Sequence, residues 1–118
     1  MVLEVIKKRQ SVRSYLDKEI PENLLQQVLE AGRLAPSASN KQHWKFIVVR
    51  DEDLRKKLVP ACKNQKFIEE APVAIAGCAT NLDYVMPCGE HSYPIDLAIA
   101  LDHMSLEAAS LGLWGPAG

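Results

Sequence analysis

The pattern of hydrophobic and polar positions divides the chain into alternating helices and strands. Residues 2–8 carry Val2, Val5 and Ile6 on one side, which predicts a short helix. Apolar residues then repeat at helical spacing from 24 to 32, behind Pro21, whose fixed φ suits the first turn of a helix. We expect this helix to end before Pro36, because the residue preceding a proline disfavours helical geometry.

Two short and continuously apolar runs predict buried strands. Residues 46–49 read FIVV between polar neighbours, and residues 73–79 read VAIAGCA after a proline. Between the runs, we expect Asp51 to cap a helix that extends to about Ala61, with Leu54 and Leu58 on its inner side. This order of helices and strands indicates an α+β or α/β sandwich and excludes a helix bundle.

The last predicted element is a long helix from about Pro94 to Leu111. Its apolar residues cover more than one stripe, and a helix that is apolar most of the way round is buried on several sides. A domain of this size has little material with which to cover such a helix. The pattern therefore points to a partner subunit.

Length, composition and charge narrow the class of protein. The 118 residues fit a single domain over 1–118, and a net charge of −1 gives no reason to expect nucleic acid or an anionic membrane as partner. The chain has neither an apolar run of transmembrane length nor the apolar core of a signal peptide near its start. Its three cysteines, an odd number without CxxC spacing, favour free thiols and a cytoplasmic location.

The first group of candidate site residues is Arg9, Ser11 and Arg13. The two arginines are four residues apart, so on a helix they would project from the same face. Two guanidinium groups and a hydroxyl that converge offer charge-assisted donors suited to a phosphate. By itself the pattern is more typical of a solvated basic helix end.

The second group lies in the polar loop after the predicted second helix. Hydroxyl and amide side chains there match the alternating donors and acceptors along the edge of a flavin or a base. The alternative is a plain turn before a strand, with Trp44 in the core. The loop runs from Ala35 to Trp44 and reads APSASNKQHW.

Other kinds of site find less support in the sequence. Cys88, His91 and His103 could approach a metal, but a tetrahedral zinc site needs a fourth ligand that no residue supplies by pattern, so we expect no metal. The six glycines form no GxGxxG loop, and no ordered Ser, His and Asp set is present. Phosphate-loop and hydrolase functions are therefore excluded.

Taken in order, these segments resemble the nitroreductase family. The RQSVR segment is followed about one helix later by APSASNKQHW, then by the FIVV strand and by QKFIEEAPV at 65–73. The stretches at 93–100 and 106–113 are similar to the family's interface helix. The resemblance covers nearly the whole chain.

The resemblance implies a fold, a cofactor and residue roles. The fold would be an α+β sandwich with a mixed sheet, in which two subunits interlock around long central helices and two FMN molecules lie at the interface. Arg9, Ser11 and Arg13 would hold the FMN phosphate and ribityl chain, with Gln10 against the flavin. Pro36, Ser37, Ser39 and Asn40, with Gln42, would reach the flavin held mainly by the other subunit. Asn64 would be a weaker candidate for the pyrimidine edge of the ring.

The implied activity is that of an oxidoreductase. NAD(P)H would reduce the flavin, which would then reduce a nitroaromatic, a quinone or a similar small acceptor in a ping-pong mechanism, without a catalytic side chain. The sequence departs from the family after Leu113, where the expected strand and C-terminal arm are missing and only Gly115 and Pro116 could approach the flavin. The alternative is a shortened, non-catalytic flavin-binding or scaffold protein of the same fold.

Overall fold

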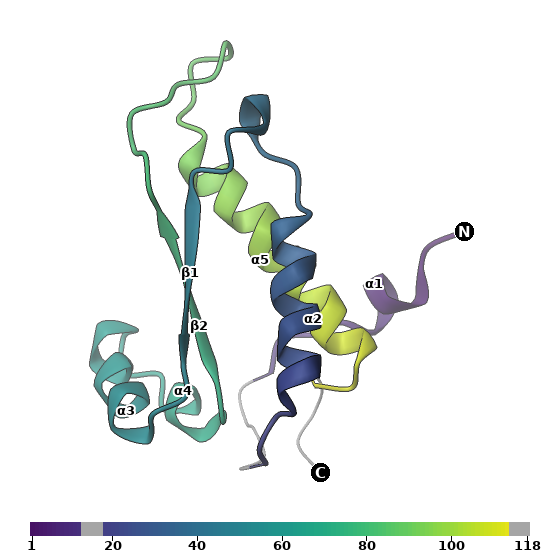
Figure 1. Ribbon diagram of the computed structural model, residues 1–118, viewed down its shortest axis with the longest axis vertical. Coiled ribbons are helices and arrows are strands. Elements are labelled where there is room, and N and C mark those ends of the chain that lie inside the picture. Colours follow the sequence, from purple (N-terminus) through teal and green to yellow (C-terminus); the bar gives the residue numbers. More distant parts are fainter. Residues whose placement is uncertain (13–17, 114–118) are drawn as a thin grey trace.

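The computed structural model describes residues 1–12 and 18–113. Two layers of helix and a pair of strands make up the described chain, with α5 between α2 on one side and the strands on the other (Figure 1). The elements are α1 Glu4–Lys8, α2 Glu22–Arg33, the 3-10 turn η1 Ala38–Asn40, β1 Trp44–Val49, α3 Glu52–Ala61, α4 Phe67–Glu70, β2 Ala74–Ala79 and α5 Tyr93–Ser110.

The long helices follow the predicted pattern closely. Helix α2 begins directly after Pro21, which occupies the N-cap, and it ends three residues before Pro36. Helix α5 carries Pro94 in its first turn, where the missing N–H of proline costs no helical hydrogen bond. The observed bounds of both helices lie within a few residues of the predicted ones.

The core lies where α2 crosses α5. Val28 of α2 and Met104 and Ala108 of α5 are buried together. Phe46 and Ile75 from the two strands pack against this cluster. Gly32 allows the helices to approach closely, because a Cβ at this position would lie 2.1 Å from Cε of Met104. The α2–α5 contact is thus the centre of the packing.

The two strands pair antiparallel, with Phe46 opposite Gly77 and Val48 opposite Ile75. Within the described ranges this pair forms the whole sheet, so the parallel pairing that a mixed sheet also requires does not occur in them. Gly77 faces α5, where an added Cβ would lie 3.2 Å from the Leu97 side chain. The helix therefore covers one face of the strand pair at close range.

Burial of the strands differs from the prediction. We expected both strands to be fully buried, but β1 alternates between half-buried and exposed positions and β2 is half-buried throughout. Ile47, on the side of β1 away from α5, is 43% exposed. The continuous apolar runs predicted strands covered on both faces, whereas in the described chain α5 covers one face of the strand pair.

Helix α3 is rotated relative to the prediction. Leu54 is 50% exposed, whereas Arg55 and Val59 face inward. The guanidinium of Arg55 donates hydrogen bonds to the carbonyls of Glu69 and Ala71, and these bonds hold that face of the helix toward α4. Asp51 occupies the N-cap position as expected, but its side chain makes no capping hydrogen bond.

Candidate functional site

The polar loop between α2 and β1 has an unusual backbone. Ser39, Asn40 and Gln42 all have left-handed conformations, with φ of 52°, 53° and 55°. Asparagine tolerates this region, but a non-glycine residue held there by its surroundings typically costs roughly 1–3 kcal/mol. Three such residues within four positions require contacts that hold the loop in place.

Those contacts come from the start of α5 and from the segment before it. The N–H of Ala38 donates to Oδ1 of the buried Asp96 at 3.1 Å. The hydroxyls of Ser39 and Tyr84 lie 2.9 Å apart and share a hydrogen bond. The ammonium of Lys41 lies 5.0 Å from the centre of the Tyr84 ring, within the range of a cation–π interaction. The two hydrogen bonds thus join the loop to residues that lie 58 and 45 positions later in the sequence.

Other hydrogen bonds form within the loop itself. The N–H of Gln42 donates to Oγ of Ser37 at 3.0 Å, and the N–H of Trp44 donates to the carbonyl of Gln42 at 2.8 Å. Ser37 can still donate its own hydroxyl hydrogen. The side chains of Ser39, Asn40 and Gln42 belong to exposed residues, while the half-buried Trp44 begins β1. The loop therefore presents hydroxyl and amide groups at the surface of the chain.

The described residues of the RQSVR segment, from Arg9 to Val12, do not continue a helix. Helix α1 ends at Lys8, and Arg9 at its C-cap is already extended, with ψ of 134°. The expectation that Arg9 and Arg13 project from the same face of a helix is therefore wrong for Arg9, because the helix ends at Lys8. Arg9 is half-buried and Ser11 is exposed, while Arg13 lies outside the described residues. The buried Val12 anchors this segment to the body of the chain.

Asn64 lies in the turn that follows α3. It adopts a left-handed conformation with φ of 58°, and its N–H donates to the carbonyl of Val59 at 2.8 Å. Such a bond from a left-handed residue is a common way to end a helix. The structure thus gives Asn64 a local role at the helix end.

A single chain keeps the three groups of predicted residues apart. In Figure 1, η1 lies at one end of the strand pair and α3 at the other, while α1 lies on the far side of α2. The structure therefore does not gather Arg9, Asn40 and Asn64 into one cleft within one chain. Gly115 and Pro116, the other predicted flavin neighbours, lie outside the described residues.

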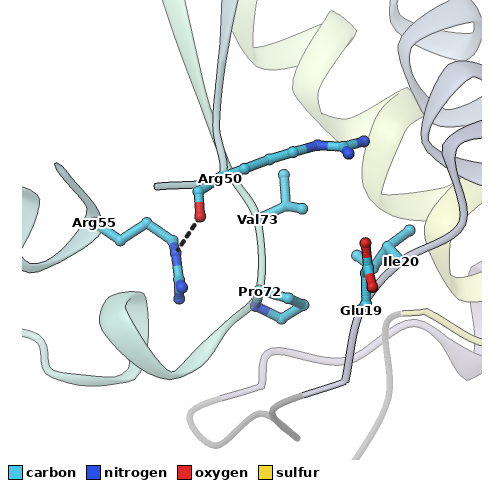
Figure 2. A pocket seen from close by; sticks show the side chains of 6 residues that line it. All are labelled: Glu19, Ile20, Arg50, Arg55, Pro72 and Val73. Atoms are coloured by element: carbon cyan, nitrogen blue, oxygen red, sulfur yellow. Dashed lines mark hydrogen bonds between the residues drawn. The ribbon is translucent and has the colours of Figure 1, made fainter. Parts of the chain in front are cut away.

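One hollow of about 200 Å³ lies away from the polar loop, between the residues that precede α2 and the start of β2 (Figure 2). Arg55 points from α3 toward the Arg50 carbonyl and donates to it at 3.3 Å, and the Arg50 side chain itself pairs with Glu22 on α2. Both arginines thus join elements of the fold. The residues that line the hollow are Glu19, Ile20, Arg50, Arg55, Pro72 and Val73.

A larger groove of about 790 Å³ runs between α1, α2 and α5, with Val5, Leu34 and Leu106 among its lining residues. His103 also lines it and is therefore remote from Cys88 and His91 in the loop before α5. Within the described ranges, no three His, Cys, Asp or Glu side chains are placed to hold a metal ion. Cys62, Cys78 and Cys88 are free thiols.

Asp96 and Tyr84 were missed by the sequence analysis. Asp96 is an acidic residue at the start of the apolar stretch that forms the first half of α5, and that contrast is a signal in the sequence. Tyr84 lies in a loop without periodicity, so the neighbouring sequence does not predict its hydrogen bond to Ser39.

The described helices include none that is long and apolar enough to cross a membrane.

Comparison with known proteins gives consistent matches. The model of the nitroreductase family matches residues 6–78. A Methanothermobacter thermautotrophicus protein, named provisionally as an NADH dehydrogenase/NAD(P)H nitroreductase, is 38% identical over 95% of this chain and 57% of its own. The FMN reductase [NAD(P)H] of Bacillus subtilis is 28% identical over 95% of this chain and 45% of its own. The chain thus spans about half the length of these relatives.

Solved structures agree on the fold. A nitroreductase family protein from Clostridium novyi NT superimposes with a TM-score of 0.82 at 30% identity, over 92% of this chain and 64% of that one. An FMN-dependent nitroreductase from Clostridium difficile gives a TM-score of 0.77 at 32% identity, over 92% and 60%. These similarities confirm the predicted α+β nitroreductase-like fold.

Proposed function

Since the chain belongs to the nitroreductase family, we propose that it is an FMN-dependent oxidoreductase that uses NAD(P)H to reduce nitroaromatics, quinones or similar small acceptors. Relatives named NAD(P)H nitroreductase and FMN reductase support an oxidoreductase. The observation that carries the flavin assignment is the loop at 37–42, in which the exposed residues Ser39, Asn40 and Gln42 have left-handed conformations. A strained loop with such anchors is typical of a binding site.

The donors of the chain fit the chemistry of FMN. The amide and hydroxyl groups of Ser39, Asn40 and Gln42 offer donors and acceptors of the kind that line the pyrimidine edge of a flavin. Arg9 and Arg13 carry permanent positive charge suited to its phosphate, and Ser11 adds a hydroxyl. The residues that we propose to hold the cofactor are Arg9, Gln10, Ser11, Arg13, Pro36, Ser37, Ser39, Asn40 and Gln42, with Asn64 as the weakest member.

The separation of these groups supports a site built from two chains. Helix α1, which Arg9 follows, lies apart from the loop in one chain, and this separation supports a site in which a second copy contributes the loop (Figure 1). Helix α5 leaves Ile95 41% exposed and Leu101 38% exposed, and Ala98 between them is exposed as well. We propose that a homodimer covers these apolar positions.

When bound, the flavin would take up electrons from NAD(P)H and pass them to the acceptor in ping-pong order. The protein's part in this is binding and orientation. Arg9 and Arg13 would neutralise the phosphate, and the loop that carries Ser39, Asn40 and Gln42 would supply hydrogen bonds to the ring. We also propose that the electron acceptor is a small molecule, that residues 1–118 form a single domain, and that the protein is cytoplasmic.

Titration with FMN and reduction under anaerobic conditions test the activity. We expect the purified protein to bind FMN, to lose its absorbance near 450 nm when NADH or NADPH is added, and to regain it with a nitroaromatic. Protein that binds FMN without this cycle would be the non-catalytic alternative. Protein that takes up no FMN would refute flavin binding and leave only a scaffold role.

Removal of the basic groups tests the phosphate assignment. Arg9→Ala and Arg13→Ala each delete a charge-assisted contact of about 1.5–3 kcal/mol, which corresponds to roughly 10- to 150-fold weaker FMN binding. Lys8→Ala removes a neighbouring exposed charge and serves as the control, with an expected change below about twofold. Equal effects at all three positions would show a general charge effect and contradict the assignment.

A charge placed on α5 tests the dimer. Ala98 is exposed in the single chain, so Ala98→Glu should leave the monomer folded but should place a carboxylate in the proposed interface. We expect sedimentation to show monomers and FMN affinity to fall. Ala61→Glu, at an exposed alanine on α3, is the matched control. A dimer that survives Ala98→Glu would place the interface elsewhere.

A further inference from the structure

The segment between β2 and α5 reaches the proposed flavin loop through a single aromatic side chain. Tyr84 is fixed along its main chain, because its N–H donates to Oδ1 of Asn81 at 3.2 Å and its carbonyl accepts from the N–H of Ser92 at 3.1 Å. Its hydroxyl lies 2.9 Å from Oγ of Ser39. The phenol therefore extends from a well-held backbone to the first left-handed residue of the loop.

Tyr84 and Asp96 hold different parts of the loop. Asp96 accepts from the N–H of Ala38, at the entry of the turn, and this hydrogen bond does not involve the Tyr84 hydroxyl. The Tyr84 hydroxyl acts one residue later, where φ becomes positive. Its ring also lies beneath the ammonium of Lys41. Loss of the hydroxyl alone should therefore loosen residues 39–42 without unfolding the chain.

We propose that Tyr84 is a positioning residue for flavin binding, which holds Ser39 in its left-handed conformation and thereby sets the direction of Asn40 and Gln42. This inference rests on the proposed function. Asn40 follows Ser39 directly and Gln42 lies three residues after it. Both belong to the same turn, because the N–H of Asn40 donates to the Ser37 carbonyl and that of Gln42 to Ser37 Oγ. A shift at Ser39 is passed on to both amide side chains.

A double-mutant cycle on FMN affinity tests this role. Tyr84→Phe removes only the hydroxyl, and we expect FMN binding to weaken about 3- to 10-fold, the effect of one neutral hydrogen bond. Ser39→Ala should weaken binding at least as much. In the Ser39→Ala background, Tyr84→Phe should have no further effect, because its partner is gone. Additive losses would mean that Tyr84 acts on the ligand directly, and they would overturn the proposal.

Two further variants separate the hydroxyl from the ring. Tyr84→Leu also removes the ring beneath Lys41 and should weaken FMN binding more than Tyr84→Phe. Tyr93→Phe is the matched control, because Tyr93 lies at the start of α5 with its ring against His91. We expect its FMN affinity to equal that of the parent. The visible absorption band of bound FMN should shift only in the Tyr84 and Ser39 variants.

Amide hydrogen exchange without FMN separates this inference from the proposed function. Tyr84→Phe should exchange faster than the parent at residues 39–42, while β2 exchanges at the same rate in both. If the parent binds no FMN but the loop is loosened, the proposed function fails and the anchoring of the loop stands. If the parent binds FMN and Tyr84→Phe changes neither affinity nor exchange, the positioning role is refuted.

Discussion

The substitution Gly32→Ala tests the close contact between α2 and α5. A Cβ at position 32 would lie 2.1 Å from Cε, 3.0 Å from Cγ and 3.3 Å from Sδ of Met104, which is only 4% exposed. The Met104 methyl can rotate away, but Cγ lies close to the α5 backbone and moves less easily. Gly32→Ala should therefore force either a poor Met104 rotamer or a wider separation of the helices.

The expected cost follows from two opposing terms. Alanine in place of glycine within a helix stabilises by about 1 kcal/mol. Overpacking of a well-packed core costs about 1–3 kcal/mol, and a 2.1 Å approach belongs in the upper part of that range. We expect Gly32→Ala to lower the free energy of unfolding by about 1–2 kcal/mol, measured by urea denaturation followed by circular dichroism at a fixed protein concentration.

Met104→Ala supplies the background in which the clash is absent. This variant alone should cost about 2–5 kcal/mol, because it removes a buried side chain. In this background, Gly32→Ala should become stabilising, since only the helix term remains. Ala31→Gly, one position earlier, calibrates that term and should cost about 1 kcal/mol in both backgrounds. An equal loss from Gly32→Ala with and without Met104 would refute the contact as its cause.

Two other predictions concern the remaining polar contacts. Arg55→Met should lower the free energy of unfolding by about 1.5–3 kcal/mol, because the carbonyls of Glu69 and Ala71 lose a charged donor. The stability of Arg55→Lys should lie between that of the parent and that of Arg55→Met. A methionine variant as stable as the parent in urea would contradict this role. The Gln26 amide, with the charge of Arg50, holds the pKa of Glu22 below its ordinary 4.5. The ionised form therefore stabilises the fold above the unfolded pKa, and this contribution is lost as pH falls through the folded one. Gln26→Ala should raise the pKa of Glu22 in an NMR titration, and an unchanged pKa would leave Arg50 as the main cause.

Local patterns were sufficient to predict the main elements. Helix α2 and helix α5 follow from apolar residues at helical spacing and from prolines at their starts, and β1 follows from a short apolar run. These signals depend on residues within a few positions of one another, so they can be read without the fold. The polar composition of the loop at 36–42 was visible in the same way, and its role in flavin binding stays a prediction.

Long-range contacts decided the features that the sequence analysis missed. The inward face of α3 follows from the bonds of Arg55 to carbonyls 14 and 16 residues away, which override the leucine pattern. The loop with the left-handed residues is hydrogen-bonded to Tyr84 and Asp96, which meet it only because α5 packs against α2 and the strands.

The sequence by itself thus determined which segments form helices and strands and which residue types gather in the loop, because propensity and periodicity act over a few residues. Only the tertiary structure decided the direction of those groups. That direction depends on hydrogen bonds between residues far apart in the chain, and such bonds exist only after the helices have packed.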